Sequence, residues 1–300
     1  MSAPLYIKVK PQDNVAIAVH DIPQGTEVMP GIHANCDIPQ AHKIALQPIP
    51  KNEPIVRYGV VLGYAKDDIQ TGDWINEHMV ILPESPALDD MPYATHIVPK
   101  EELPEPTVTT WMGYKNEHGP AGTRNLLGIM TTVQCVAGVA KVAVERIKKE
   151  LLPKYPNVDG VVAVTHPYGC GVAINAPMAY IPIRSLHNII HHPNFGGEVM
   201  VLGLGCEKLT YERLMDPEDI TPENCLTIQE CHGHDEMMNQ IMAMAEKKLQ
   251  KLNQRKREPL PLSELVIGMQ CGGSDAFSGL TANPSAGYAA DMLVRGGGTV

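Results

Sequence analysis

The sequence predicts an α/β protein, with a small, mostly β domain at the N-terminus followed by an α/β domain that has a largely parallel sheet. Over residues 1–82, short apolar runs are separated by Pro, Gly and Asp turns. From Trp111 on, β-branched apolar runs alternate with segments of helical periodicity, which is the pattern of a parallel sheet covered by helices. Between these regions, residues 83–108 are rich in Pro and acidic residues and predict an extended linker.

The strands expected in the N-terminal domain are bounded by turn signals. The turns fall at Pro-Gln-Asp, Pro-Gln-Gly and Thr-Gly-Asp, and Pro and Gly in such positions interrupt strands. Short apolar segments between turns of this kind favour β structure. The segments are YIKVK, NVAIAV, IVRYGVVLGYA and WINEHMVIL.

Five short apolar runs predict the strands of the α/β domain, which we place over residues 109–300. Two longer segments, Val136–Leu151 and Asp235–Arg257, repeat apolar residues at helical spacing and predict amphipathic helices. The sequence ends in LVRGGGTV, which is typical of the approach to another strand, so we expect the chain to be a fragment. The five expected strands are Leu126–Val133, Val158–Thr165, Glu198–Leu204, Leu226–Gln229 and Leu265–Gln270.

Composition and charge exclude several classes of protein. The formal net charge is −10, which argues against nonspecific nucleic-acid binding because that needs clustered Lys and Arg. The basic run Lys247–Arg257 is expected to be a solvated helix end. No apolar stretch is long enough to span a membrane and no signal peptide is present, so we expect a cytoplasmic protein. Local cations can still bind an anionic substrate.

The seven cysteines are an odd number in a chain expected to be cytoplasmic. Disulfides are therefore not expected, and metal ligation, catalysis and simple burial remain as interpretations. Neither a dinucleotide-binding GxGxxG in its proper context nor a Walker A motif is present, which argues against NAD and ATP.

Polar side chains follow each of the five expected strands. The carboxyl ends of parallel strands meet at one edge of a sheet, where ligands bind, so we expect these groups to line one crevice. A cysteine at a strand end can equally be a small buried hydrophobic residue. The groups are Gln134-Cys135, His166 to Cys170, Gly205-Cys206-Glu207-Lys208, Glu230-Cys231-His232-Gly-His234 and Cys271-Gly-Gly-Ser274-Asp275.

Several of these residues suit particular chemistry. His166 and Cys170 could share iron or zinc, which imidazole and thiolate ligands suit. The pair His232 and His234 is equally consistent with a metal site and with solvated side chains. Arg124, in the Gly-rich segment GYKNEHGPAGTRN, could bind a carboxylate through its planar fork or simply cover a turn.

In the N-terminal domain, Ala41-His42-Lys43 offers a candidate base or ligand. A surface pair is the alternative reading of this His and Lys. Lys208 is a further candidate partner for a substrate carboxylate.

Four blocks of this sequence together resemble one family, the galactarate and altronate dehydratases. The resemblance covers essentially the whole chain, and the N-terminal domain resembles the SAF domain that precedes the catalytic part of these proteins. Family members continue beyond the position of Val300. The blocks are GYKNEHGPAGTRNLLGIMTTVQC, THPYGCG, VLGLGCE and CGGSDAFSGLTANPSAG.

The resemblance implies a hydro-lyase, activated by Fe2+, that converts the sugar diacid galactarate to 5-dehydro-4-deoxy-D-glucarate. Such a reaction needs a base, an acid and groups that stabilise developing negative charge. We expect His42, His166 and Asp275 to be catalytic. We expect Cys170, Cys206, Glu207 and Cys271 to bind the metal, and we expect substrate contacts from Lys43, Arg124, Asn125, Lys208, Ser274 and Asn283.

Three alternatives remain open. The substrate could be altronate or a related hydroxy acid, or the protein could bind a sugar acid without catalysis. Cys135, Cys170, Cys206 or Cys271 could instead hold an iron–sulfur centre. The expected partner is a small sugar diacid, with no nucleic acid and no membrane, and a homo-oligomer is left open.

Overall fold

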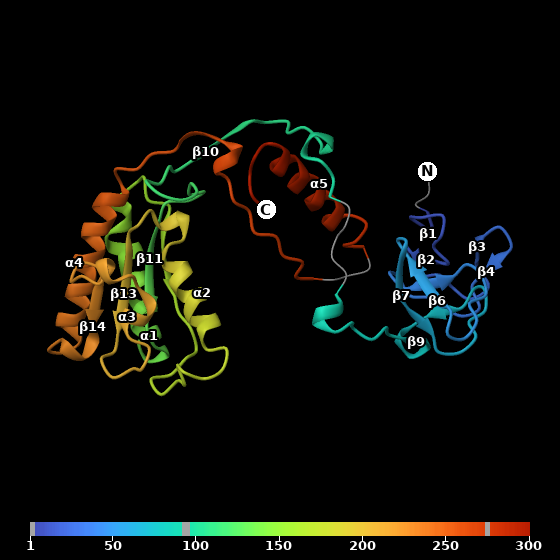
Figure 1. Cartoon of the computed structure of the whole chain (residues 1–300), viewed down its shortest axis with the longest axis horizontal. Helices are drawn as coiled ribbons and strands as arrows, with labels where there is room; N and C mark the ends of the chain where they lie inside the picture. Colours follow the sequence, from blue (N-terminus) through green and yellow to red (C-terminus); the bar gives the residue numbers. More distant parts are fainter. Residues whose placement is uncertain (1–3, 92–96, 274–276) are drawn as a thin grey trace. The chain divides into compact units, whose positions relative to one another are not determined.

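The computed structural model describes residues 4–91, 97–273 and 277–300. The chain forms two compact units (Figure 1). The first contains Met1–Leu103 and Met269–Asp291, and the second contains Pro104–Gly268 and Met292–Val300. The range 109–300, which the sequence suggested as one domain, is thus shared by both units. No helix in the described part of the chain is both long and apolar enough to cross a membrane.

The first unit begins with an antiparallel β module, as the sequence predicted. Its sheets have the orders β1-β2-β5-β8, β3-β4 and β6-β7-β9, and every pairing within them is antiparallel. The strands are β1 (Tyr6–Ile7), β2 (Val15–Ala18), β3 (Glu27–Met29), β4 (Ile32–His33), β5 (Lys43–Ala45), β6 (Pro54–Arg57), β7 (Val60–Ala65), β8 (Trp74–Ile75) and β9 (Val80–Ile81).

The run IVRYGVVLGYA folds as a hairpin of β6 and β7. Tyr58 and Gly59 both have positive φ, at 57° and 76°, which is the backbone of the mirror-image turns that suit strand twist. The Asp13 carboxylate accepts a 2.7 Å hydrogen bond from the Gly59 N–H and a 2.9 Å bond from the Lys10 N–H. The turn is therefore fixed to the neighbouring loop.

The remainder of the first unit has little regular structure. The described residues between Leu82 and Pro104 form two single 3-10 turns, Leu88–Asp90 and Lys100–Glu102, and lie mostly exposed, as a linker would. Helix α5 (Ala282–Arg295) extends from the first unit into the second and has no buried side chain.

The second unit is built on a four-stranded sheet of order β12-β11-β13-β14, in which all pairings are parallel. The strands are β11 (Leu126–Thr131), β12 (Gly160–Val164), β13 (Val199–Gly203) and β14 (Cys225–Thr227). Four of the five expected strands are therefore confirmed. A separate antiparallel pair joins β10 (Thr110–Gly113) to β15 (Glu258–Pro261).

The expectation of a fifth strand at Leu265–Gln270 is wrong. Only Val266 forms a β-bridge there, with Thr299, and Gly268, Met269 and Gln270 are exposed. The apolar run had suggested a strand, but an apolar run does not by itself supply a neighbouring strand to pair with.

Helices cover both faces of the parallel sheet (Figure 1). On one face, α1 (Ala137–Glu150) and α4 (His234–Leu252) pack with Leu127, Ile129 and Met200 in one apolar core. On the other face, α2 (Tyr180–Ile190) and the short α3 (Tyr211–Leu214) pack with Met130 and Val201. The α1 and α4 segments match the two helices that the sequence predicted.

The basic run Lys247–Arg257 is only partly a solvated helix end, which corrects the expectation. Lys248 is buried, and its Nζ lies 3.0 Å from Glu198 Oε2 and 2.7 Å from Asn224 Oδ1. A buried ammonium group requires such partners because its desolvation is costly. Lys247 and Lys256 are exposed.

The strand order determines where a ligand crevice forms. The chain moves from β11 outward to β12 and then crosses to β13 on the other side of β11. Open parallel sheets bind ligands outside the carboxyl ends of strands where the order reverses in this way. Here that position lies at the ends of β11 and β13.

Candidate functional site

The loops that follow the four parallel strands contact one another at the carboxyl edge of the sheet. Backbone hydrogen bonds connect the Gln134 N–H to the Tyr168 carbonyl at 2.8 Å and the Lys208 N–H to the Cys170 carbonyl at 3.2 Å. A third, of 3.1 Å, runs from the Gln229 N–H to the Leu204 carbonyl. The four strand ends that the sequence singled out in this unit therefore lie at one edge.

Glu207 lies at the reversal point between β11 and β13. Its carboxylate accepts hydrogen bonds from the Thr132 hydroxyl, from the Leu204 N–H at 2.9 Å and from the Gly205 N–H at 2.6 Å. Burial by itself would raise the pKa of Glu207, but these hydrogen bonds more than offset burial and lower it. The carboxylate is therefore ionised at neutral pH.

The backbone around Glu207 depends on two glycines. Gly205 has φ +119°, a conformation that side chains disfavour. A Cβ on Gly203 would lie 2.5 Å from the Tyr211 hydroxyl and 3.0 Å from Glu207 Oε1. The Tyr211 hydroxyl also lies 3.3 Å from Thr227 Oγ1, and burial raises the pKa of Tyr211 to about 12.

His166 is buried and both of its ring nitrogens contact backbone. Nε2 donates to the Thr131 carbonyl at 3.0 Å, and Nδ1 accepts from the Tyr168 N–H at 3.2 Å. Burial lowers the pKa of His166, although contacts with Thr131 and Thr132 raise it in part. The imidazole is neutral and is bonded to the last residue of β11 and to the loop after β12.

Three thiols at this edge, Cys135, Cys170 and Cys206, are exposed, whereas Cys231 is partly buried. The Gln229 amide lies 3.6 Å from Cys206 Sγ. Lys208 is also exposed. This edge thus combines a fixed carboxylate with an ammonium group and thiols that solvent can reach.

The Gly-rich segment before β11 lies at the opposite edge of the sheet. Arg124 is exposed there. Asn125 is completely buried, where its amide donates to the Asn157 and Leu252 carbonyls and its oxygen accepts from Arg255. These contacts give Asn125 a structural role in place of the expected substrate contact.

A cavity of about 500 Å³ opens at this amino edge of the sheet. The segment after β10 and the segment after α2 form much of its wall, and Lys115, His191 and Arg255 lie on it. The sequence had not singled out this cavity.

The remaining candidates belong to the first unit. His42 Nδ1 accepts a 3.0 Å hydrogen bond from the Trp74 indole. Lys43 is the first residue of β5. Burial makes the largest contribution to lowering its pKa, and the positive charge of Arg57 lowers this pKa further. Asn283 donates to Cys271 Sγ at 3.6 Å. Ser274 and Asp275 lie outside the described residues.

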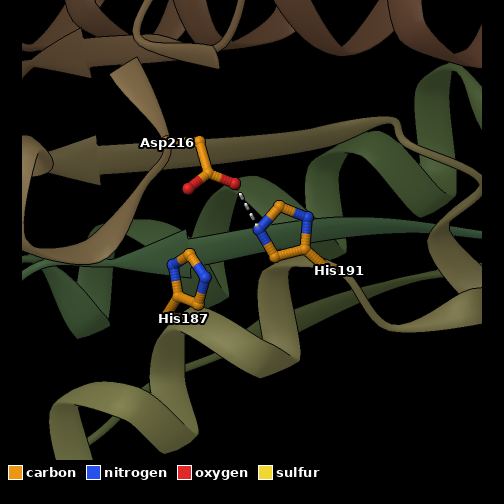
Figure 2. A group of neighbouring side chains, drawn as sticks. All are labelled: His187, His191 and Asp216. Carbon is orange, nitrogen blue, oxygen red and sulfur yellow. Dashed lines mark ion pairs between the residues drawn. The ribbon is translucent and has the colours of Figure 1, made fainter. Parts of the chain in front are cut away.

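Two groups of residues were missed by reasoning from the sequence. Thr132 contacts Glu207, and the hydroxyls of Thr131-Thr132 at the end of an apolar run were the available signal. The second group is His187, His191 and Asp216, whose ligand atoms all lie within 4.8 Å of one another (Figure 2). The i,i+4 histidines in HNIIH could have indicated it.

Three protein-family models match successive parts of this chain. Residues 4–83 match "Altronate/galactarate dehydratase SAF domain", and residues 113–253 match "D-galactarate dehydratase/Altronate hydrolase, second domain". Residues 262–300 match "D-galactarate/Altronate dehydratase, C-terminal".

Curated relatives agree with these matches. Galactarate dehydratase (L-threo-forming) of Escherichia coli (strain K12) is 55% identical over 98% of this chain and 58% of its own length. Altronate dehydratase of Bacillus subtilis (strain 168) is 36% identical, with the same coverage. The (2R)-sulfolactate sulfo-lyase subunit beta of Chromohalobacter salexigens is 28% identical over 64% of this chain and 45% of its own length. The chain thus spans less than two thirds of the length of these relatives.

Proposed function

Because the chain belongs to the galactarate and altronate dehydratase family, we propose that it is a hydro-lyase that dehydrates galactarate to 5-dehydro-4-deoxy-D-glucarate. The observation that carries the choice of substrate is the identity of 55% to a galactarate dehydratase, against 36% and 34% to altronate dehydratases. Altronate is the second candidate substrate, because two altronate dehydratases are also similar to this chain.

The chemistry requires a proton to leave the carbon next to a carboxylate and a hydroxyl to leave the following carbon. The first step builds negative charge, which cationic or hydrogen-bonding groups must stabilise. Lys208, exposed at the reversal point, is our candidate for this charge and for a substrate carboxylate. Glu207 holds the Cys206–Lys208 loop through its bonds to Leu204 and Gly205.

Proton transfer is assigned to His42, His166 and Asp275 as part of the same proposal. His42 Nε2 is the ring nitrogen that the Trp74 contact leaves for a substrate, because that contact uses Nδ1. His166 would need to exchange one of its backbone contacts to take up a proton. Lys43, Ser274 and Asn283 remain proposed substrate contacts. Arg124 lies at the opposite edge of the sheet from His166 and Lys208, so it is not assigned to the same small substrate.

The expected iron ligands do not fit one ion in this arrangement. Among described residues, the ligand atoms of Cys170, Cys206 and Glu207 do not converge as a group, and Glu207 accepts three hydrogen bonds from the protein. Fe2+ is therefore proposed from family membership alone, and no step is derived through it. Metal and sulfide analysis of anaerobically purified protein distinguishes a single ion from an iron–sulfur centre.

The proposal extends to the protein's setting. We propose a cytoplasmic location, a small sugar diacid as the partner molecule, and assembly as a homo-oligomer, which light scattering would test.

An anaerobic assay with Fe2+ tests the proposed activity. Formation of an α-keto acid is measured with galactarate, D-glucarate and altronate, and we expect the highest kcat/KM with galactarate. A higher value with altronate would show that the substrate assignment is wrong. No α-keto acid from any of the three would contradict the hydro-lyase proposal.

The variant Lys208→Met tests the role of the ammonium group at the reversal point. Loss of a charge-assisted contact to a carboxylate should lower kcat/KM for galactarate by roughly tenfold or more, since such bonds contribute about 1.5–3 kcal/mol. Lys247→Met, on the exposed face of α4, is the matched control and should leave kcat/KM unchanged. Equal activity of both variants would remove Lys208 from the site.

A further inference from the structure

His187, His191 and Asp216 gather at the amino edge of the parallel sheet, on the opposite side of the second unit from Glu207. His187 lies in the last turn of α2 and His191 directly follows that helix. Asp216 follows α3 by two residues. Figure 2 shows the two imidazoles and the carboxylate directed toward a common space.

The spacing of the ligand atoms suits a single metal ion. His191 Nε2 lies 3.3 Å from Asp216 Oδ2, and the ligand atoms of all three residues lie within 4.8 Å of one another. An ion about 2.0–2.2 Å from each ligand in tetrahedral geometry separates neighbouring ligand atoms by about 3.4 Å. Residues four apart on a helix share one face, which brings the two imidazoles together.

The orientation of His187 also matches that of a metal ligand. Its Nδ1 donates to the Leu214 carbonyl at 3.2 Å, which leaves Nε2 with a lone pair directed away from this contact. Metal-bound histidines almost always donate their second nitrogen to such a backbone or carboxylate oxygen. Leu214 is completely buried and precedes Asp216 by two residues. The same short segment therefore positions two ligands, because it holds His187 through the Leu214 carbonyl and carries Asp216 itself.

An exposed ion pair between His191 and Asp216 is a simpler reading of part of this geometry. Such pairs between exposed side chains contribute little to stability. The ion pair accounts for two of the side chains, but it gives no reason for His187 to present a free ring nitrogen to the same space.

We propose that His187, His191 and Asp216 form a binding site for a divalent first-row transition metal, of which Zn2+ and Fe2+ are the representative ions. Two imidazoles with one carboxylate suit these ions better than Mg2+ or Ca2+, which take oxygen ligands. Three protein ligands leave at least one position for water or a small ligand. His191 and Asp216 are 42% and 48% exposed, and His191 lies on the 500 Å³ cavity, so an ion can enter.

Titration with Co2+ tests this site without any assay of activity. Tag-free protein is stripped of metal, Co2+ is added, and the visible d–d absorption is followed, with Zn2+ added last as a competitor. We expect one Co2+ per chain, displaced by Zn2+. His187→Gln and Asp216→Asn should each weaken Co2+ binding by at least about tenfold.

His192→Gln is the matched control. His192 neighbours the site, but its Nδ1 accepts from the Asn194 N–H at 3.1 Å and it is not one of the three ligands. Its substitution should leave the Co2+ affinity unchanged. Thermal unfolding of each variant shows whether the fold is retained, and the near-isosteric Asp216→Asn is expected to retain it.

Two outcomes would overturn the proposal. One is the absence of a Co2+ spectrum at millimolar Co2+. The other is a spectrum with thiolate-to-metal charge transfer that persists in the folded His187 and Asp216 variants and disappears when the thiols are alkylated, because this would place the ion on cysteines instead.

Discussion

Glu207 is a carboxylate whose charge is fixed by its neighbours. Its pKa is lowered despite burial, because the Thr132 hydroxyl and two backbone N–H groups donate to it. The role that the structure shows for this side chain is to hold the loop that carries Cys206 and Lys208. A metal role for Glu207 stays a prediction.

The variant Glu207→Gln tests this role through stability. Gln keeps the size of the side chain but directs an NH2 group at some of the same donors, so we expect a loss of about 1–3 kcal/mol in the free energy of unfolding. Urea denaturation at pH 7 measures the loss. Glu230→Gln, at an exposed position after β14, is the control and should change little.

The same variant gives a pH dependence of known sign. Since the folded pKa of Glu207 lies below the ordinary value of 4.5, its stabilising effect is complete above about pH 4.5 and is lost as pH falls through the lower folded value. The stability difference between the unchanged protein and Glu207→Gln should therefore shrink below pH 4. A difference that stays constant from pH 7 to pH 3 would contradict this account.

At the scale of the elements, the end of β13 is closely packed at the candidate site. Gly203 ends this strand where the Tyr211 hydroxyl and Glu207 approach the backbone. A larger residue has no room there unless one of these groups moves. The strand end thus depends on the absence of a side chain.

The variant Gly203→Ala should destabilise the protein by about 1–3 kcal/mol through overpacking. Adding Tyr211→Phe removes the hydroxyl that the new methyl would meet at 2.5 Å, so the double variant should recover part of the loss. Gly138→Ala in α1 is the control, because its Cβ meets nothing within 4 Å, and it should be neutral or stabilising. Thermal unfolding of the unchanged protein and of these three variants measures the differences in stability.

At the scale of the whole molecule, the chain divides into two units with separate apolar cores. The core of the β module consists of residues between Tyr6 and Val80, with Ile44, Ile55 and Ala65 completely buried. None of these core residues comes from the second unit. The β module therefore has what it needs to fold on its own.

A fragment of residues 4–83 tests this independence. It should give a cooperative thermal transition and a β-type circular dichroism spectrum, because its core and its antiparallel pairings are internal. The core variant Ile44→Ala should lower the transition temperature of the fragment and of the intact chain alike. A fragment with no cooperative transition would show that its fold requires the rest of the chain.

The sequence predicted much of the second unit correctly, for a physical reason. The central strands β11 and β13 are buried on both faces and therefore read as continuous apolar runs, while α1 and α4 each bury one face and show helical periodicity. The run at Leu265–Gln270 has a similar composition, yet it pairs through one bridge alone. Helix α2, which contains Pro182, was not predicted.

The candidate site was predictable only in part. Glycines and polar groups directly after apolar runs correctly placed Cys170, Cys206, Glu207 and Lys208 at one edge of the sheet. The family resemblance suggested a substrate contact for Asn125, although its amide is buried and bonded to the protein. Position in the sequence gives the end of a strand, but it does not give the partners of a side chain.

The sequence by itself determined the fold class, the family and the edge of the sheet where polar groups gather, because periodicity, turn residues and strand ends are local properties of the chain. The tertiary structure alone decided which side chains meet: Thr132 with Glu207, Lys248 with Glu198, and His187 and His191 with Asp216. These contacts join residues from different loops and helices, and only the packing of helices on the sheet brings them within bonding distance.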